Sequence, residues 1–388
     1  MSNEMPEPMK RFPRAGSAPC CPTIRRLLAA GVAAAVLLGL PSASLLGPSA
    51  SPSVARADTG DDEPVPPKVQ AAVDKALAWL SKNQKPEGTW QAGNGISTSV
   101  PSLAVMAFLA RGHVPGQGPY GDTLTKAIDF VLTQQKEDGL LAGNNGNAQM
   151  YEHGISTAML SECFGMVDDA RKAKIQKALA KSAQLILAAQ RPHDNKPKNM
   201  PYTGGWRYTK ASEDADISVT GWQLMGLRGA ANCGATVPKE SLEAGREFVR
   251  RCAVPKDSGG GFTYQAGNRD ANPPRTGTGI LSLELLGEHN SPEAILGGDY
   301  LLDHPINTDQ GFYFYGVYYI SQAFNQLGGK YWETGYPKLR DTLLAAQNDQ
   351  GIWPNGSGQE LEAGDAYRTS MACLALCVPY RYLPLYQK

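Results

Sequence analysis

The chain has no excess of positive charge. Lysine and arginine together number 37, as do aspartate and glutamate, so the formal net charge of the 388 residues is zero. Residues 1–57 have the features of an export signal, and removing them takes away six basic and two acidic side chains. This leaves 37−6 = 31 basic against 37−2 = 35 acidic groups, a net of −4. No basic stripe survives, which argues against a nucleic-acid partner.

Cysteine is scarce as well. Two of the seven cysteines, Cys20 and Cys21, lie in the first 57 residues, and five remain after them. An odd number leaves at least one thiol unpaired, so the chain is not a disulfide scaffold. Cys373 and Cys377 share one helical face and are expected to be small core residues. Export would permit a bridge between Cys233 and Cys252, and the sequence leaves this open.

The N-terminal segment is predicted to be a signal peptide over residues 1–57. A basic stretch precedes fourteen uncharged residues at 27–40, and Ala55-Arg56-Ala57 supplies a cleavage site flanked by small residues. We therefore expect an exported protein, either periplasmic or secreted. The alternative is a chain that stays anchored in a membrane by the uncleaved segment. Residues 58–68 are acidic and rich in proline, which predicts a disordered linker before a domain at 69–388.

The most informative feature is a repeated pattern of a glutamine, a glycine turn and a large apolar residue. Three copies are regular: Gln84 with Gly88 and Trp90, Gln135 with Gly139 and Leu141, and Gln347 with Gly351 and Trp353. Looser copies run from Gln190 to Gly205-Trp206, from Cys252 to Gly261-Phe262, and from near Asp303. Starting points about 44–62 residues apart indicate one supersecondary unit copied several times.

Helical patterns occur in pairs around these turns. Amphipathic, outer-type helices are predicted at 69–83, 124–134, 170–190, 239–251, 292–302 and 337–347. Nearly uniformly apolar, inner-type helices are predicted at 99–110, 153–165, 217–231, 276–286, 312–327 and 366–378. A hairpin cannot bury its own apolar face, but a neighbour on each side can. The sequence therefore predicts an all-α fold, an (α/α)6 toroid of six hairpins joined by Gln-x3-Gly-x-Trp repeats.

These turns resemble the Gln-Trp repeats of squalene and terpenoid cyclases and of protein prenyltransferase β subunits. The resemblance covers nearly all of the chain that follows the linker, about residues 69 to 380. It implies an (α/α)6 barrel whose central cavity opens where the inner helices begin. In the enzymes of that superfamily the cavity holds an isoprenoid chain. Function has to be argued from the site rather than from the barrel.

Zinc-dependent prenyl transfer is rejected on the residues at the corresponding positions. Arg207 and Lys210 keep the spacing of an Arg and a Lys that hold diphosphate in prenyltransferases. However, Ser218 stands where the resemblance requires a zinc-binding cysteine, and Arg368 stands where it requires a histidine. Asp216 alone cannot form a zinc site that needs three protein ligands. We expect no metal and no cofactor.

The cyclase comparison directs attention to two aspartates. Asp214-Ala215-Asp216-Ile217 is similar to the Asp-x-Asp-Asp motif with which squalene cyclases protonate an alkene, with isoleucine in the last position. Paired carboxyl groups can still divide roles by shifting each other's pKa. Asp214 and Asp216 are therefore the candidate catalytic residues. The alternative is that Asp216 only caps the N-terminus of an inner helix.

The other candidate ligand-binding residues lie near the starts of inner helices. Tyr151-Glu152-His153 resembles a segment that lines the diphosphate pocket of prenyltransferases, although a lone histidine is commonly just a hydrogen-bonded polar residue. The aromatic run at 312–319 could face a flat apolar ligand or simply fill a narrowing barrel. The full predicted set is Tyr151, Glu152, His153, Trp206, Arg207, Lys210, Trp222, Tyr313, Tyr315, Asp365, Tyr367 and Arg368.

Three functions remain open. The leading interpretation is a terpenoid cyclase-like toroid that binds an isoprenoid, a lipid or another small apolar ligand, with peripheral membrane contact and residual acid-initiated chemistry. The second is a carbohydrate-active (α/α)6 enzyme, because this barrel also hosts glycosidases and lyases. Its carboxylate pair would come from Glu152, Asp216, Glu362 and Asp365. The third is a non-catalytic binding or interaction scaffold.

Overall fold

The computed structural model describes residues 65–387, apart from 94, 145–147 and 193–200. The predicted signal peptide, and all of the predicted linker before residue 65, lie outside the described residues. Within the described part the chain forms helices and turns, with no strand beyond three isolated bridges. No helix in this part is long and apolar enough to cross a membrane.

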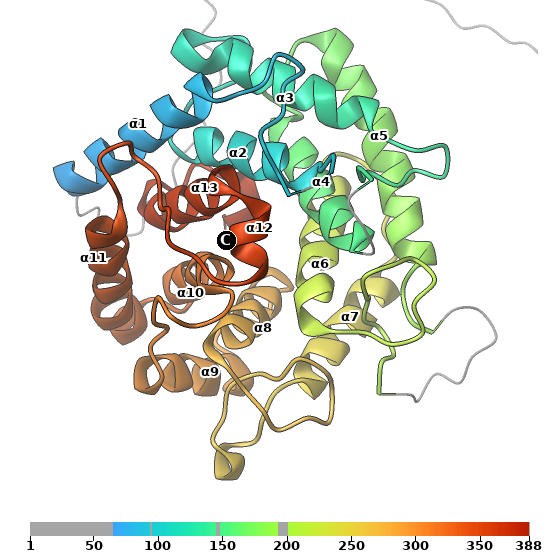
Figure 1. Ribbon diagram of the computed structural model, residues 1–388. Coiled ribbons are helices and arrows are strands. Elements are labelled where there is room, and N and C mark those ends of the chain that lie inside the picture. Colours follow the sequence, from blue (N-terminus) through green and yellow to red (C-terminus); the bar gives the residue numbers. More distant parts are fainter. Residues whose placement is uncertain (1–64, 94, 145–147, 193–200, 388) are drawn as a thin grey trace, which may run out of the picture. The chain divides into compact units, whose positions relative to one another are not determined.

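The helices alternate between an outer and an inner ring (Figure 1). The outer helices are α1 (Pro67–Lys82), α3 (Gly121–Thr133), α5 (Asp169–Ala188), α7 (Lys239–Arg251), α9 (Pro292–Asp303) and α11 (Tyr336–Ala346). The inner helices are α2 (Ser99–Ala110), α4 (Gln149–Cys163), α6 (Ile217–Asn232), α8 (Pro273–Leu285), α10 (Tyr313–Leu327) and α13 (Asp365–Leu376). A one-turn helix, α12 (Gln359–Ala363), stands just before α13.

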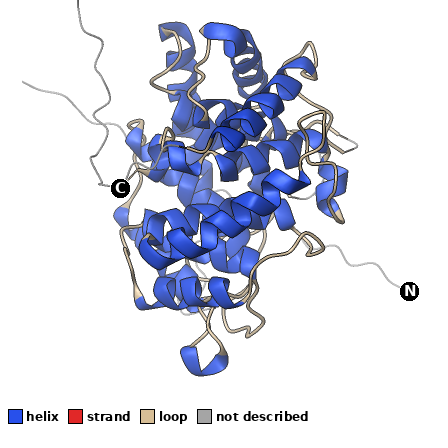
Figure 2. Ribbon diagram, turned by 90° about the vertical axis from the view of Figure 1, so that its left-hand side faces the viewer, coloured by secondary structure: helices blue, strands red, loops and turns tan. Residues whose placement is uncertain are grey.

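The inner ring is closed. Each inner helix packs against the next in the order α2, α4, α6, α8, α10 and α13, and α13 packs against α2. Helix α2 is buried from Val100 to Ala110, as expected for a helix surrounded on all sides. Viewed from the side, the described residues again consist of helices joined by loops (Figure 2). The predicted all-α (α/α)6 toroid is confirmed, and α12 is an addition that the six-pair prediction did not include.

The repeat glutamines join neighbouring outer helices. The side-chain amide of Gln135 donates to the carbonyl of Gly139 in its own turn, at 3.1 Å, and to that of Ala178 on α5, at 3.0 Å. The same two bonds recur in three other repeats: Gln84 to Gly88 and Thr123, Gln190 to Gly204 and Ser241, and Gln347 to Gly351 and Ala72. The last of these connects α11 to α1 and so closes the outer ring.

The repeat tryptophans complete the same joints. The indole nitrogens of Trp90, Trp206 and Trp353 donate to the carbonyls of Leu80, Ile186 and Leu343 at 2.7–2.8 Å. All three rings are at most 3 % exposed. Trp206 was also a candidate ligand-binding residue, but its only indole donor is used here and its ring does not line the central cavity. Its role is structural, because the repeat geometry turns the ring toward the preceding outer helix.

Gln135→Met is expected to lower the free energy of unfolding by about 2 kcal/mol, because it removes the bonds to Gly139 and Ala178 while keeping side-chain volume. Gln134→Met is the matched control, since among the described residues the Gln134 amide bonds only the hydroxyl of the adjacent Thr133. The control should change stability by less than about 0.5 kcal/mol. Thermal and denaturant unfolding of both variants would measure the difference, and equal effects would contradict the assigned role of the glutamine.

The C-terminal segment covers one end of the ring. The backbone N–H of Leu385 donates to Glu162 near the end of α4, at 2.7 Å, and Gln326 near the end of α10 donates to the carbonyl of Tyr386, at 2.8 Å. The hydroxyl groups of Tyr386 and Tyr318 also bond each other. The contacts to Glu162 and Gln326 lie at the C-terminal ends of α4 and α10, so the segment closes the end of the ring opposite the helix N-termini.

Stability is expected to fall by about 1–2 kcal/mol between pH 6.5 and 8 because of Glu162. Burial raises the pKa of this carboxyl from 4.5 to about 8, and the single N–H of Leu385 opposes the shift only in part. The folded state then holds a proton that the unfolded state has lost, so the stabilisation is full at low pH and disappears as pH rises through 8. His153, with its pKa lowered to about 4, and Asp216, with its pKa raised to about 6, titrate below this window.

Denaturant unfolding at pH 6.5 and 8.0 would measure this effect, with Glu162→Gln as the comparison. The variant should show little change between the two pH values, since it has no carboxyl to titrate. An equally steep pH dependence in the variant would assign the effect to another group.

All five cysteines in the described part are free thiols. The bridge between Cys233 and Cys252 that the sequence left open is not formed. Cys373 and Cys377 are both buried, as predicted, and they act as small core residues of α13 and the turn after it.

Candidate functional site

A cavity of about 1270 Å³ opens at the N-terminal end of the inner ring. Each of the six inner helices contributes side chains from its first two turns. On four of them the contributing residues are one turn apart, because residues i and i+4 share a helix face: Ser99 and Leu103, Tyr151 and Ile155, Ser218 and Trp222, and Tyr367 and Met371. The cavity wall is therefore set by the register in which each inner helix begins.

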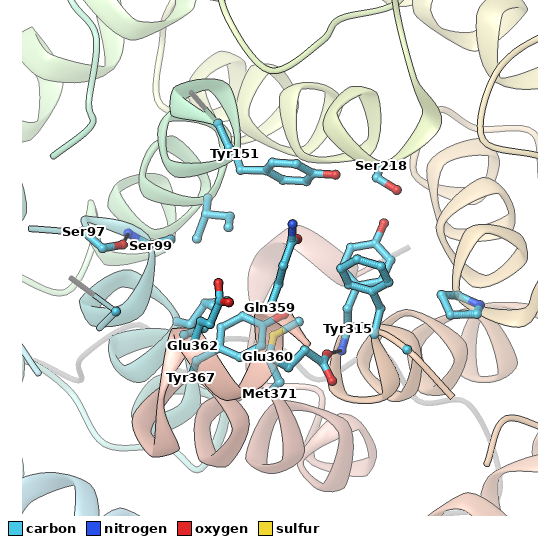
Figure 3. A pocket seen from close by; sticks show the side chains of 18 of the residues that line it. Ser97, Ser99, Tyr151, Ser218, Tyr315, Gln359, Glu360, Glu362, Tyr367 and Met371 are labelled. Carbon is cyan, nitrogen blue, oxygen red and sulfur yellow. Dashed lines mark hydrogen bonds between the residues drawn. The ribbon is translucent and has the colours of Figure 1, made fainter. Parts of the chain in front are cut away.

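Several polar side chains point into this space (Figure 3). The phenol of Tyr151, the amide of Gln359 and the carboxylate of Glu362 all face the centre of the cavity. Among the described residues no hydrogen bond or ion pair engages the side chain of Glu362, which is largely exposed. Rings from Tyr315 and Tyr367 border the same space. The cavity therefore combines flat apolar faces with unsatisfied donors and acceptors.

Glu360, two residues before Glu362 on α12, is held differently. It is 2 % exposed, and its carboxyl accepts hydrogen bonds from the backbone N–H groups of Phe314, at 3.3 Å, and Tyr315, at 2.9 Å. These are free donors at the start of α10, where a helix needs acceptors. Burial nevertheless outweighs these bonds and raises the pKa of Glu360. This carboxyl lines the cavity and releases its proton less readily than an exposed glutamate does.

Glu152 lies on the wall contributed by α4. One of its oxygens, Oε2, accepts from the backbone N–H and the hydroxyl of Thr98 and from the N–H of Gly143, at 2.7, 3.1 and 2.9 Å. It thereby fixes the start of α2 and the loop beside it. Because one oxygen of Glu152 accepts three hydrogen bonds, this carboxyl holds the neighbouring backbone in place. Glu152 also lines the cavity.

Arg368 binds the backbone of helix α12 and holds this helix in place. This side chain is 3 % exposed, and its guanidinium donates to the carbonyls of Trp353, at 3.0 Å, and Glu360, at 2.7 Å. It also forms an ion pair with Asp365. Arg368 and Asp365 were candidate ligand-binding residues, but neither lines the cavity. The structure places the arginine underneath the segment that carries Glu360 and Glu362.

The two candidate catalytic aspartates lie outside the cavity wall. Asp216 is fully buried and accepts from the N–H of Val219 at 2.9 Å, so it is the N-cap of α6. Its other oxygen lies 3.3 Å from Arg207, and Asp214 lies 3.4 Å from the same guanidinium. Burial raises the pKa of Asp216 to about 6, although Val219 and Arg207 counteract it. The cap that the sequence offered as an alternative is what the geometry shows.

Arg207 supports the cavity from behind. Its guanidinium lies over the rings of Tyr208, at 4.4 Å, and Tyr264, at 5.1 Å, and the hydroxyls of these tyrosines bond each other. Both tyrosines line the cavity, whereas Arg207 does not. Arginine paired with two aspartates and stacked on two rings makes this part of the wall rigid.

Three more candidate ligand-binding residues lie outside the cavity wall. His153 is fully buried between the N–H of Leu141, at 3.0 Å, and the carbonyl of Ser182, at 3.2 Å. Burial lowers its pKa to about 4, so the ring is neutral, as suits a hydrogen-bonded core residue. Lys210 forms an exposed ion pair with Asp138, and Tyr313 is 3 % exposed in the core. None of these three lines the cavity.

Six of the predicted residues thus meet at one site: Tyr151, Glu152, Trp222, Tyr315, Tyr367 and, from the carboxylate candidates, Glu362. Sequence reasoning did not place the following lining residues there: Ser97, Ser99, Tyr208, Ser218, Tyr264, Asn272, Arg275, Gln310, Gln359, Glu360 and Met371. Most of them stand on the first turn of an inner helix or in the loop before it. No group of three or more His, Cys, Asp or Glu residues in the described part could hold a metal ion.

Comparison with known proteins identifies the fold. No family model matches the chain, and no curated protein matches its sequence. Among solved structures, the GH76 α-mannanase of Bacteroides thetaiotaomicron aligns with a TM-score of 0.57 and 12 % identity over 81 % of this chain and 96 % of that one. The GH76A α-1,6-mannanase of Salegentibacter sp. HEL1_6 aligns with 0.56 and 11 % over 80 % and 99 %. The type II terpene cyclase MstE of Scytonema aligns with 0.50 and 13 % over 80 % and 97 %. The fold is an (α/α)6 toroid, shared by glycoside hydrolases and terpene cyclases alike.

Proposed function

We propose that the chain is a carbohydrate-active enzyme that binds a glycan in the central cavity and hydrolyses it. The observation that carries this proposal is the position of Glu362. Among the described residues this cavity-lining carboxylate has no hydrogen-bond or ion-pair partner, and it stands two residues from Glu360, a buried carboxyl whose pKa is raised. Glycoside hydrolysis uses two carboxyl groups, one that donates a proton to the leaving oxygen and one that acts as base or nucleophile.

The two carboxyl groups divide the reaction as follows. Glu360 gives its proton to the oxygen of the glycosidic bond as that bond breaks. Glu362 either takes a proton from the attacking water or attacks the sugar carbon itself before water releases the product. Both routes consume one water for each bond broken. Arg368 holds the backbone of α12 in place, which keeps both carboxyl groups on the cavity wall.

The remaining wall suits a sugar better than a hydrocarbon. Sugar rings have apolar faces that pack on aromatic rings and hydroxyls that need hydrogen-bond partners. Tyr151, Tyr315, Tyr367 and Trp222 supply the rings, while Gln359 and Arg275 supply polar groups. The shared toroid of the two mannanases supports the proposal, and mannose-containing glycans are the first to test.

The competing proposal is terpenoid cyclase-like isomerase chemistry on an isoprenoid. It would use Asp214 and Asp216 as the acid and is supported by the shared toroid of the terpene cyclase MstE. Against it, both aspartates lie off the cavity wall, and both are paired with Arg207. Export through residues 1–57 is proposed as well, since it would bring a glycan-degrading enzyme to extracellular polysaccharide.

The test is a screen of the purified protein against α- and β-linked polysaccharides, α-mannans included, with release of reducing ends as the readout. We expect at least one glycan to be cleaved. A parallel incubation with squalene and with prenylated aromatics tests the competing proposal. A cyclised terpenoid product, with no glycan bound or cleaved, would replace the glycosidase by the cyclase. Glycan binding without cleavage would favour the non-catalytic scaffold.

A further inference from the structure

The cavity ends halfway down the inner ring. Its deepest lining residues, Ile155, Trp222 and Met371, are the sixth or seventh residues of their helices. At 1.5 Å per residue the cavity therefore reaches roughly 10 Å below the helix starts. The same helices contain 12–16 residues and extend about 18–24 Å, so their second halves lie beneath the cavity floor.

Aromatic side chains fill the space under that floor. Trp222 is stacked on Tyr318, with ring centres 5.7 Å apart and planes 6° from parallel, and Tyr319 meets Trp222 edge-on at 5.7 Å and 71°. All three side chains are at most 1 % exposed. Packed rings in these arrangements leave no passage for a chain.

The C-terminal segment adds a second layer below the rings. Tyr386 bonds the hydroxyl of Tyr318, and Leu385, 1 % exposed, is tied to Glu162 by its backbone N–H. In the described part of the chain this floor closes the far end of the cavity, so a ligand enters and leaves at the helix N-termini.

The mouth is walled on several sides. Loop residues Gln91 and Gly93, the segment 310–312 and helix α12 all border the cavity, in addition to the six inner helices. Phe312 and Leu361, both 52 % exposed, stand in two of these rim segments. A polymer that lies across a site needs a groove open at two opposite ends. Here the described lining residues come from all six inner helices and from these three rim segments.

We infer that the site recognises the end of a glycan chain, with the terminal unit resting on the floor made by Trp222 and Met371. This inference rests on the proposed function and narrows it to an enzyme that releases a short product from a chain end. The scissile bond then lies higher in the cavity, beside α12, where Glu360 and Glu362 stand. The depth of the floor below these two residues sets the length of the product.

The test uses an oligosaccharide of a glycan that the screen shows to be cleaved. Three forms are compared: untagged, tagged with a bulky fluorophore at the reducing end, and tagged at the non-reducing end. One of the two tags is expected to slow cleavage by about 100-fold or more, because a bulky end clashes with the closed floor. The other tag should be tolerated, and the polymer should yield one short product size from the first minutes.

Two results would overturn the inference, and they differ from each other. Tolerance of both tags, with a ladder of product sizes from the polymer, would show that chains bind across the mouth, and the glycosidase proposal would stand. Failure to cleave any untagged glycan in the screen would remove the proposed function and this inference together.

Discussion

Replacing Glu362 by glutamine is expected to lower the rate of glycan cleavage by about 10²–10⁴-fold while leaving the fold unchanged. The amide has nearly the same shape as the carboxylate but cannot accept a proton or attack the sugar carbon. The carboxylate has no hydrogen-bond partner in the described part of the chain, so no structural contact is lost with it. The measurement is kcat and KM on the glycan found in the screen, together with the thermal unfolding temperature.

Glu137→Gln is the matched control. Glu137 is exposed, stands in the turn of the second repeat and does not line the cavity. The control should keep full activity and the same unfolding temperature. A Glu362→Gln enzyme that loses less than about tenfold would assign the chemistry to another carboxyl, with Glu152 the next one on the cavity wall. A change in KM alone, at constant kcat, would make Glu362 a binding residue.

The fold could be predicted from the sequence because the repeated motif determines how neighbouring hairpins join. Each regular copy supplies a glutamine amide, a glycine and a large apolar side chain, and these three groups make the joint between neighbouring hairpins. The structure adds that the glutamine reaches the next outer helix, as Gln347 reaches Ala72 across the whole length of the domain. A pattern within one repeat cannot reveal that partner, because the partner belongs to the following repeat.

The site could be predicted only in part, because its residues depend on where the inner helices begin. We predicted starts at 153 and 276, whereas α4 begins at Gln149 and α8 at Pro273. The pair Pro273-Pro274 suggests that a helix can begin only after it. Proline nevertheless fits the first turn of a helix, where its missing N–H is not needed. The missed turns carry lining residues such as Arg275. Glu360 was missed for a different reason: its partners Phe314 and Tyr315 are 45 or more residues away.

The chemical motifs were misleading for a physical reason. Asp214 and Asp216 attract attention as paired carboxylates beside Arg207 and at the start of an inner helix. The start of a helix needs a capping acceptor, and an arginine beside it needs an anionic partner. Asp216 caps α6, and both aspartates pair with Arg207. Glu362 was one of four carboxylates that the sequence offered for a carbohydrate-active enzyme, and only the cavity separates it from Asp216 and Asp365, which are paired with arginines. Sequence identifies strongly bonded residues more easily than free ones.

Gly351→Ala is expected to destabilise the ring at its closure, lowering the free energy of unfolding by about 3–4 kcal/mol. Gly351 has φ +90°, in the left-handed region, and a Cβ there would lie 2.8 Å from the carbonyl oxygen of Lys75 on α1. This turn joins the last hairpin to the first, so the clash pushes α1 away from the end of α11. The bonds of Gln347 to Ala72 and Gly351 would weaken with it.

Gly234→Ala separates the backbone strain of a positive φ from the steric clash with α1. Gly234 also has φ +90°, but a Cβ there would meet nothing within 4 Å. The control carries the backbone strain alone and should cost about 1–2 kcal/mol, and the remaining loss in Gly351→Ala measures the contact between α11 and α1. Hydrogen exchange should locate that loss in α1 and α11 and leave α5 and α7 protected. Equal destabilisation by the two substitutions would mean that the ring does not depend on this closing turn.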